Sequence, residues 1–362
     1  MTMRLSTVRE VDHSVGVTCG SLQHMDKTPE QLTIAGVERT YAAPRESPPA
    51  GQGGDELPDF MASTTDGSLM ETAKLGPFGL DGVSIGDAAE LIPDLPDGSI
   101  DIVVTSPPYW GQRLSHGVGV EEDPRSYVDS LVALFDLLRD KLKRHGVMWI
   151  NMGDSYNTPV NWRPGDRSYS SLGANGSGLS ENNSAYVKPR AKRQAFVDDS
   201  GEAPWLQYGN LLGLPERVVF GLCERGWLYR GRVSWHKQNP MPEGRCRRPH
   251  RQEEPIFLLA RDERHSFRVN PPVPQVWSFP NEKLDDGLPK HFSRYPFELP
   301  RRCIEAYGEV GDDVIVLDPF AGSGTTGIAA IELGCRFVGF EIDAEHADAA
   351  NVRIERIFRR SS

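Results

Sequence analysis

The segment Asp318–Gly327, with the sequence DPFAGSGTTG, indicates the fold of this chain most directly. An apolar run at residues 314–317 precedes it and a helical pattern at 326–333 follows, so we expect a glycine-rich turn between a strand and a helix. Glycines let such a turn bring its backbone close to a ligand at the helix N-terminus. Glu341 lies at the end of the next expected strand, 337–342, where an acidic side chain can accept hydrogen bonds from two ribose hydroxyls. The pattern therefore predicts a ligand that carries a ribose.

A second motif, Thr105–Trp110 with the sequence TSPPYW, follows an expected strand at residues 100–104. Two consecutive prolines fix the backbone and remove two N–H donors, so we expect their carbonyl groups to point outward at the carboxyl edge of the sheet. Tyr109 and Trp110 then form an exposed aromatic pair that suits stacking on an unpaired base. The alternative is a rigid turn whose two aromatic rings pack in the core.

The chain alternates between strand and helix patterns from residue 83 onward. Asp123 and Pro124 form a helix start, with Asp as the N-cap, and Gly146 is the expected end of that helix. This alternation predicts an α/β fold with a largely parallel sheet. The expected strands are 83–85, 100–104, 147–151, 227–235, 255–260, 314–317 and 337–342, and the expected helices are 124–146, 211–225, 300–307, 326–333 and 344–362.

Composition suggests where the folded domain begins. Residues 1–78 are rich in Pro, Gly, Ser and Thr without a sustained apolar period, so we expect a disordered extension before a folded domain at 79–362. Residues 155–204 are polar and form an expected insertion, a candidate for target recognition. The sequence has no apolar run long enough to span a membrane, no signal-peptide pattern and five scattered cysteines, which together predict a cytoplasmic protein.

The two motifs together resemble those of the DNA amino-methyltransferases that modify cytosine N4 or adenine N6, in the permuted class whose catalytic motif precedes the cofactor motif. Ser106–Tyr109 (SPPY) matches the catalytic tetrapeptide of that family, and Asp318–Thr325 matches its cofactor loop. The resemblance covers roughly residues 82–350. Further similar blocks are Ile85–Asp87 with Leu95–Ser99, Trp149–Asp154, Trp235–Glu243 and His291–Pro296.

The resemblance implies a Rossmann-like methyltransferase fold with a circularly permuted sheet, S-adenosyl-L-methionine as cofactor and no metal. Instead of binding the cofactor, Asp87 could cap a helix, and His291 and Ser293 could simply belong to a loop. The positions implied in cofactor binding are Asp87, His291, Ser293, Asp318, Phe320, Gly322, Ser323, Gly324, Thr325, Thr326 and Glu341.

The implied catalytic residues are Ser106, Pro107, Pro108 and Tyr109. An exocyclic amine is a poor nucleophile because its lone pair is delocalised into the ring. Hydrogen bonds from its N–H groups to the Pro107 carbonyl and to Ser106 would localise that pair, while Tyr109 stacks on the base. Orientation of the reacting atoms then supplies most of the catalysis. No cysteine adjoins the motif, as a covalent route to base-carbon methylation would require.

Ser106 bears on which base is modified. Adenine enzymes of the family usually carry Asp or Asn at this position, whereas Ser resembles the cytosine-N4 group. A hydroxyl can accept from N4 and also donate to a ring nitrogen, whereas a carboxylate is only a strong acceptor. We therefore expect cytosine N4 as the target, with adenine N6 as the alternative.

Double-stranded DNA is the implied partner, even though the chain has a net charge of −11. Residues 225–268 hold eleven Lys or Arg against five Asp or Glu, and such local charge governs phosphate contact. The expected DNA contacts are Lys237, Arg245, Arg247, Arg248 and Arg251, with a solvated loop as the alternative. A paired restriction endonuclease and an orphan enzyme of bacterial or phage origin both stay open. The spacing of Cys246, His236, His250 and His265 fits no standard zinc site.

Three other functions compete with this prediction. A catalytically inactive DNA-binding relative is disfavoured by the intact SPPY and DPFAGSGT motifs. A nicotinamide dehydrogenase would use the literal GxGxxG at Gly322–Gly327 but leaves the SPPY segment without a role. Protein glutamine methyltransferases have a related Pro-Pro-Tyr motif, but they place the cofactor loop first in the chain.

Overall fold

The computed structural model describes residues 73–111, 117–158, 195–198, 201, 203–240, 247–281 and 295–361. All of them belong to the compact unit Ser68–Ser362. Most of the predicted N-terminal extension and of the predicted insertion at 155–204 lies outside the described residues. Just before and across the expected boundary at residue 79, β1 (Lys74–Leu75) and β2 (Phe78–Gly79) form a small antiparallel pair.

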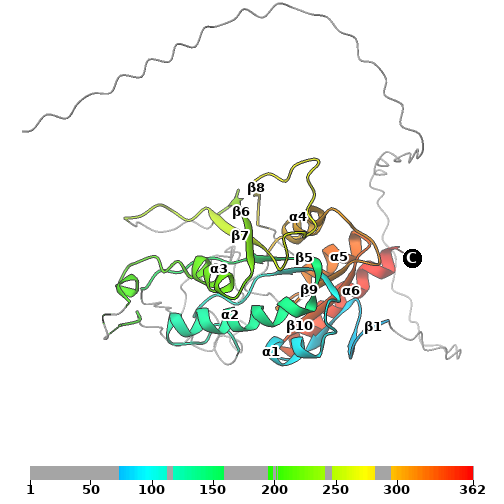
Figure 1. Cartoon of the computed structure of the whole chain (residues 1–362), viewed down its shortest axis with the longest axis horizontal. Helices are drawn as coiled ribbons and strands as arrows, with labels where there is room; N and C mark the ends of the chain where they lie inside the picture. Colours follow the sequence, from blue (N-terminus) through cyan, green and yellow to red (C-terminus); the bar gives the residue numbers. More distant parts are fainter. Residues whose placement is uncertain are drawn as a thin grey trace, which may run out of the picture. The chain divides into compact units, whose positions relative to one another are not determined.

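A central sheet of eight strands has the order β3-β10-β9-β4-β5-β7-β6-β8 (Figure 1). Within this sheet β7 runs antiparallel to both of its neighbours, and all other adjacent pairs are parallel, so the predicted α/β class with a mostly parallel sheet is confirmed. The strands are β3 (Gly82–Ile85), β4 (Ile100–Thr105), β5 (Leu142–Asn151), β6 (Leu228–Lys237), β7 (Glu253–Ala260), β8 (Val276–Phe279), β9 (Ile315–Asp318) and β10 (Arg336–Glu341).

Helices cover both faces of the sheet, and each face has its own apolar cluster. The α-helices are α1 (Ala88–Leu91), α2 (Pro124–Lys141), α3 (Leu214–Glu224), α4 (Glu298–Tyr307), α5 (Thr325–Glu332) and α6 (Ala344–Ser361). Short 3-10 turns lie at Ile92–Asp94 and Pro204–Leu206. No helix in the described part of the chain is both long and apolar enough to cross a bilayer.

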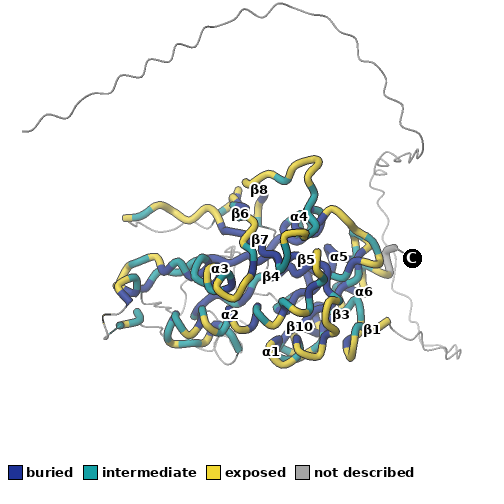
Figure 2. The backbone as a smooth tube through the Cα atoms, viewed as in Figure 1, coloured by how far each residue is buried: buried dark blue, intermediate teal, exposed yellow. Residues whose placement is uncertain are grey.

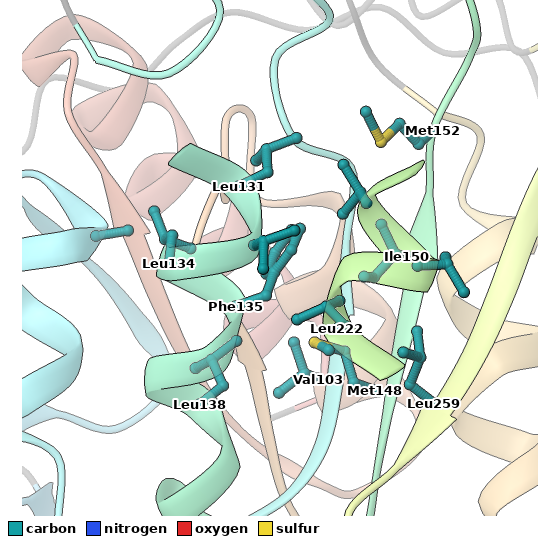
Figure 3. Close-up of a cluster of buried hydrophobic side chains, with 14 of the residues drawn as sticks. Val103, Leu131, Leu134, Phe135, Leu138, Met148, Ile150, Met152, Leu222 and Leu259 are labelled. Carbon is teal, nitrogen blue, oxygen red and sulfur yellow. The ribbon is translucent and has the colours of Figure 1, made fainter. Parts of the chain in front are cut away.

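Alternating side chains of the central strands divide the core between these two faces. Val103 packs with α2 and α3, where Leu131, Phe135 and Leu222 meet it (Figure 3). Its neighbour Val104 packs on the opposite face with α4, α5 and α6. All six residues of β4 are buried, and the central strands are the most buried part of the fold (Figure 2). This double coverage explains why the strand is an almost uninterrupted apolar run.

The start of α2 was predicted correctly, but its end was not. The Asp123 side chain accepts a hydrogen bond from the Arg125 N–H at 2.8 Å, as an N-cap should. The helix ends at Lys141 rather than at Gly146, because Leu142 already pairs with Ile100 in the sheet. Gly146 lies within β5, where an added Cβ would stand 3.0 Å from the Asp101 carbonyl oxygen. Glycine is therefore required there by close packing and not by helix termination.

Strands β4 and β9 bring the two sequence motifs together. They are adjacent and parallel, with Ile102 opposite Val316 and Val103 opposite Leu317. Their carboxyl ends, Thr105 and Asp318, therefore lie side by side although 213 positions separate them. Strand β8, which sequence patterns missed, adds an outer parallel strand beside β6.

Phe135 on α2 offers a test of the core facing α2 and α3. Its buried ring meets the Phe320 ring edge-on, with centroids 6.3 Å apart. We expect Phe135→Ala to lower the free energy of unfolding by about 3–5 kcal/mol, through lost burial and a cavity. Leu137→Ala on the same helix, where the side chain is 39% exposed, should cost less than about 1 kcal/mol. Urea denaturation followed by circular dichroism measures both, and equal losses would contradict this assignment of the core.

Candidate active site

The Asp318 carboxylate lies at the centre of the carboxyl edge of the sheet. Its Oδ1 accepts hydrogen bonds from the Thr105 hydroxyl at 2.7 Å and from the Phe320 N–H at 3.0 Å. Its Oδ2 accepts from the hydroxyls of Tyr295 at 2.8 Å and Thr326 at 2.6 Å. One carboxylate therefore joins the ends of β4 and β9, the start of α5 and the segment that leads into α4.

Burial gives this carboxylate an architectural role. Asp318 and Thr326 are both 0% exposed, and burial raises the pKa of Asp318 although its hydrogen-bond donors oppose the shift. Both residues were expected to contact the cofactor. The structure corrects that expectation, because their polar atoms bond to each other and to neighbouring loops beneath the surface.

A small recess lies beside this network at the carboxyl edge of the sheet. It is formed where β3, β9 and β10 end, together with the loop that precedes α2. Three predicted cofactor contacts, Asp87, Phe320 and Glu341, line it. The full lining is Gly86, Asp87, Ala88, Gly117, Val118, Pro319, Phe320, Glu341 and Ile342.

Glu341 lines the recess and fixes the turn beside it. The Glu341 carboxylate accepts from the Gly322 N–H at 2.9 Å and from the Asp343 N–H at 3.0 Å. Gly322 has φ of +51°, and the nearest atom to an added Cβ would be the Phe320 carbonyl oxygen at 3.9 Å. The backbone therefore meets open space here in a conformation that favours glycine.

Asp87 combines two of the roles considered for it. It lines the recess, and its side chain also caps α1 by accepting from the Ala89 N–H at 2.9 Å. The capping interpretation is therefore confirmed. His291 and Ser293, the two positions expected near the methionine end of the cofactor, lie outside the described residues.

The remaining residues of the predicted cofactor loop lie behind the turn. Ser323 and Thr325 are buried, with their hydroxyl oxygens 3.3 Å apart. Gly324 begins α5 with φ of +76°, and an added Cβ would stand 3.0 Å from Ala350 Cβ on α6. These residues hold the turn against α6, and Pro319 and Phe320 are the loop positions that line the recess.

The SPPY segment follows β4 directly. Ser106 and Pro108 are half-buried, and Pro107 is buried. The Tyr127 hydroxyl on α2 donates to the Pro108 carbonyl at 2.9 Å, so this carbonyl is engaged inside the protein and does not point outward. Among the described residues, none donates a hydrogen bond to the Pro107 carbonyl.

The prediction that Tyr109 and Trp110 form an exposed aromatic pair is wrong for this conformation. Tyr109 is 4% exposed and Trp110 is 3% exposed, and both belong to the apolar cluster beneath α2. The Trp110 indole N–H donates to the Glu121 carbonyl at 2.8 Å. The alternative, in which both rings pack in the core, therefore describes the structure.

Tyr109 is instead part of a buried polar chain. Its hydroxyl donates to Glu254 Oε2 at 3.1 Å, and Lys237 Nζ pairs with Glu254 Oε1. The Lys237 side chain is only 5% exposed. Its assignment as a DNA contact is thus corrected, because the ammonium is turned inward to a buried carboxylate. Burial and the Glu254 charge raise the pKa of Tyr109, so the phenol stays protonated.

A family model described as "DNA methylase", for enzymes of the N6/N4 type, matches residues 100–352. The chain belongs to this DNA methylase family. Membership agrees with the fold class and with S-adenosyl-L-methionine as the cofactor, and it sets aside the dehydrogenase and protein-methyltransferase alternatives.

Relatives of this DNA methylase agree over most of its length. It is 31% identical over 319 residues to the type II methyltransferase M.Cfr9I of Citrobacter freundii, covering 82% of this chain and 96% of the relative. It is 33% identical over 295 residues to M.SmaI of Serratia marcescens, covering 77% and 91%. Among solved structures, the PvuII DNA methyltransferase (cytosine-N4-specific) matches with a TM-score of 0.54 and 20% identity, over 77% of this chain and 93% of that one. The structural match shows a shared fold.

The basic segment of the methylase lies at the same edge of the sheet, beyond β5. The guanidinium carbons of Arg248 and Arg251 lie 4.3 and 5.6 Å from the centre of the Tyr156 ring. Arg251 also donates to the Asp154 carbonyl at 3.0 Å. Arg247 is exposed, whereas Arg245 lies outside the described residues. The described arginines form a surface suited to phosphate groups.

Sequence reasoning missed three contributors to this site. Tyr295 was placed in the block His291–Pro296 without a role. A tyrosine just before a helix gives no sequence signal for a contact with Asp318. Glu254 was counted only as an acid in a basic region. Val118 lies in a glycine-bordered segment, Gly117–Gly119, whose glycines were the available signal for a tight loop at the recess. In the described part of the methylase, no three His, Cys, Asp or Glu side chains are grouped to hold a metal.

The Asp318 network can be tested through stability. We expect Asp318→Ala to lower the free energy of unfolding by about 3 kcal/mol or more, because it leaves several buried donors without an acceptor. Asp318→Asn should cost clearly less, since its amide oxygen can keep the Phe320 N–H while the hydroxyls of Tyr295 and Thr326 turn to accept from its amide nitrogen. Chemical denaturation compares the two, and an alanine variant as stable as the wild type would contradict the role of Asp318.

Proposed function

We propose that the chain transfers a methyl group from S-adenosyl-L-methionine to the exocyclic N4 of cytosine in DNA. The observation that carries this proposal is the Thr105–Asp318 hydrogen bond of 2.7 Å. It fixes the SPPY segment next to the turn that borders the recess, so an amine beside Ser106 would lie close to the cofactor. Family membership supports DNA methylation, and Ser106 supports cytosine as the base.

The recess residues fit the adenosine part of the cofactor. The Glu341 carboxylate would accept from the ribose hydroxyls, Asp87 would contact the adenine, and the Phe320 ring, supported edge-on by Phe135, would pack against it. When bound, the cofactor supplies an electrophilic sulfonium methyl. The chain contributes binding and orientation, and the apolar walls at Val118 and Phe320 exclude water from the reacting atoms.

On the base side, the Pro107 carbonyl and the Ser106 hydroxyl would accept the two amine hydrogens. That pull localises the nitrogen lone pair and points it at the methyl group. Tyr109 would hold the base, which requires its ring to become accessible when the base enters. Orientation of the two reactants provides the largest share of the rate enhancement in such a reaction.

The basic surface provides the contact with the DNA backbone. Arg247, Arg248 and Arg251 would neutralise phosphates beside the flipped base. The relatives M.Cfr9I and M.SmaI are both called type II methyltransferases, which supports a role beside a restriction endonuclease of matching specificity.

Analysis of the product tests the proposed function. The purified chain is incubated with labelled cofactor and unmethylated plasmid DNA, which is then digested to nucleosides and identified by mass. We expect N4-methylcytosine, because a serine hydroxyl begins the catalytic segment. N6-methyladenine would establish the adenine alternative. Binding of the cofactor without methylation of any DNA would indicate an inactive relative.

Gly322 offers a test of the cofactor recess. We expect Gly322→Val to weaken cofactor binding at least about tenfold, because a β-branched side chain is strained at φ of +51° and would disturb the N–H whose hydrogen bond Glu341, a lining residue of the recess, accepts. Gly334→Val is the matched control, since Gly334 has φ of +76° at the far end of α5 with no atom within 4 Å of an added Cβ. Isothermal calorimetry should show normal affinity in the control. Equal affinities in both variants would place the cofactor elsewhere.

A further inference from the structure

A chain of buried polar groups lies directly behind the SPPY segment. The Tyr109 hydroxyl donates to Glu254 Oε2 at 3.1 Å, and Glu254 Oε1 is paired with Lys237. The chain therefore runs from Lys237 through Glu254 to Tyr109, and all three side chains are almost completely buried.

The direction of these hydrogen bonds follows from the chemistry of each group. An ionised Glu254 carboxylate can only accept, so the single proton of the Tyr109 hydroxyl points to it. The carboxylate therefore fixes the direction of the Tyr109 hydroxyl, in the same segment that begins with Ser106.

The backbone at Gly153 lies close to the Tyr109 ring in this conformation. An added Cβ on Gly153 would stand 2.7 Å from Tyr109 Cε2 and 3.3 Å from Glu254 Oε1, so the backbone closes tightly over both groups. The Lys237 ammonium lies 4.8 Å from the centre of the Trp235 ring. Because apolar residues of similar volume often replace a buried ion pair without loss of stability, folding alone does not account for this pair beside the site.

We propose that Glu254, held by Lys237, is a positioning residue that orients the Tyr109 side chain and thereby holds the SPPY segment in the geometry that receives the base. This inference rests on the proposed function, because it assigns the SPPY segment to the base. The proposal predicts that the buried pair of Lys237 and Glu254 affects turnover but not cofactor affinity.

Two matched double variants test the proposal in the full-length chain. Lys237→Met with Glu254→Leu removes the acceptor and the ion pair together, whereas Lys237→Met with Glu254→Gln removes the charges but keeps an acceptor oxygen. We expect the leucine variant to methylate unmethylated plasmid DNA about tenfold more slowly in single turnover, as the loss of one hydrogen bond in the transition state would produce. The glutamine variant should stay within about threefold of the wild type. In both double variants, the cofactor affinity and the Tm should match those of the wild type.

Tyr109→Phe provides a second route to the same answer, since it keeps the ring and removes the hydroxyl. We expect a similar tenfold loss in the wild-type background and no further loss in the leucine variant, because both changes interrupt the same chain. A leucine variant as fast as the wild type, a glutamine variant as slow as the leucine variant, or additive losses would each overturn the proposal. A wild-type chain that methylates no DNA would instead overturn the proposed function.

Discussion

The buried Asp318 carboxylate is the constraint on which the active site depends. It concentrates four hydrogen bonds from three hydroxyls and one backbone N–H on a single group at 0% exposure. A carboxylate in such a place is costly unless its oxygens are satisfied, so the surrounding loops are held in one arrangement. The donors Thr105 and Thr326 come from opposite sides of the site. Their common acceptor therefore holds the catalytic segment and the cofactor turn at a constant separation.

This arrangement explains why the order of motifs along the chain does not matter for the reaction. In a parallel sheet all strands end at one edge, and β4 and β9 are adjacent there whichever of them comes first in sequence. The recess forms beside β9, β10 and β3, while the SPPY segment extends from β4 toward β5 and β7. Asp318 joins the recess side of this edge to the SPPY side through its hydrogen bond with Thr105.

A second polar network supports the base side of the site. Lys237 and Glu254 come from β6 and β7, the two strands that meet in antiparallel fashion at the same edge. A segment that looks basic in sequence therefore contains an inward cation, Lys237, paired with Glu254, and two arginines, Arg248 and Arg251, beside the Tyr156 ring.

The sequence alone was sufficient for the fold class, the ends of most strands and the identity of both motifs. These properties depend on local patterns: apolar runs, helix caps such as Asp123, and glycines such as Gly322 at a tight turn. Tertiary structure alone decided which side chains reach the site. Tyr109 looked exposed and Lys237 looked like a surface charge, because burial depends on partners such as Glu254 that are remote in sequence. Asp318 was read as a ligand contact for the same reason, since nothing local in the sequence shows that three distant hydroxyls converge on it.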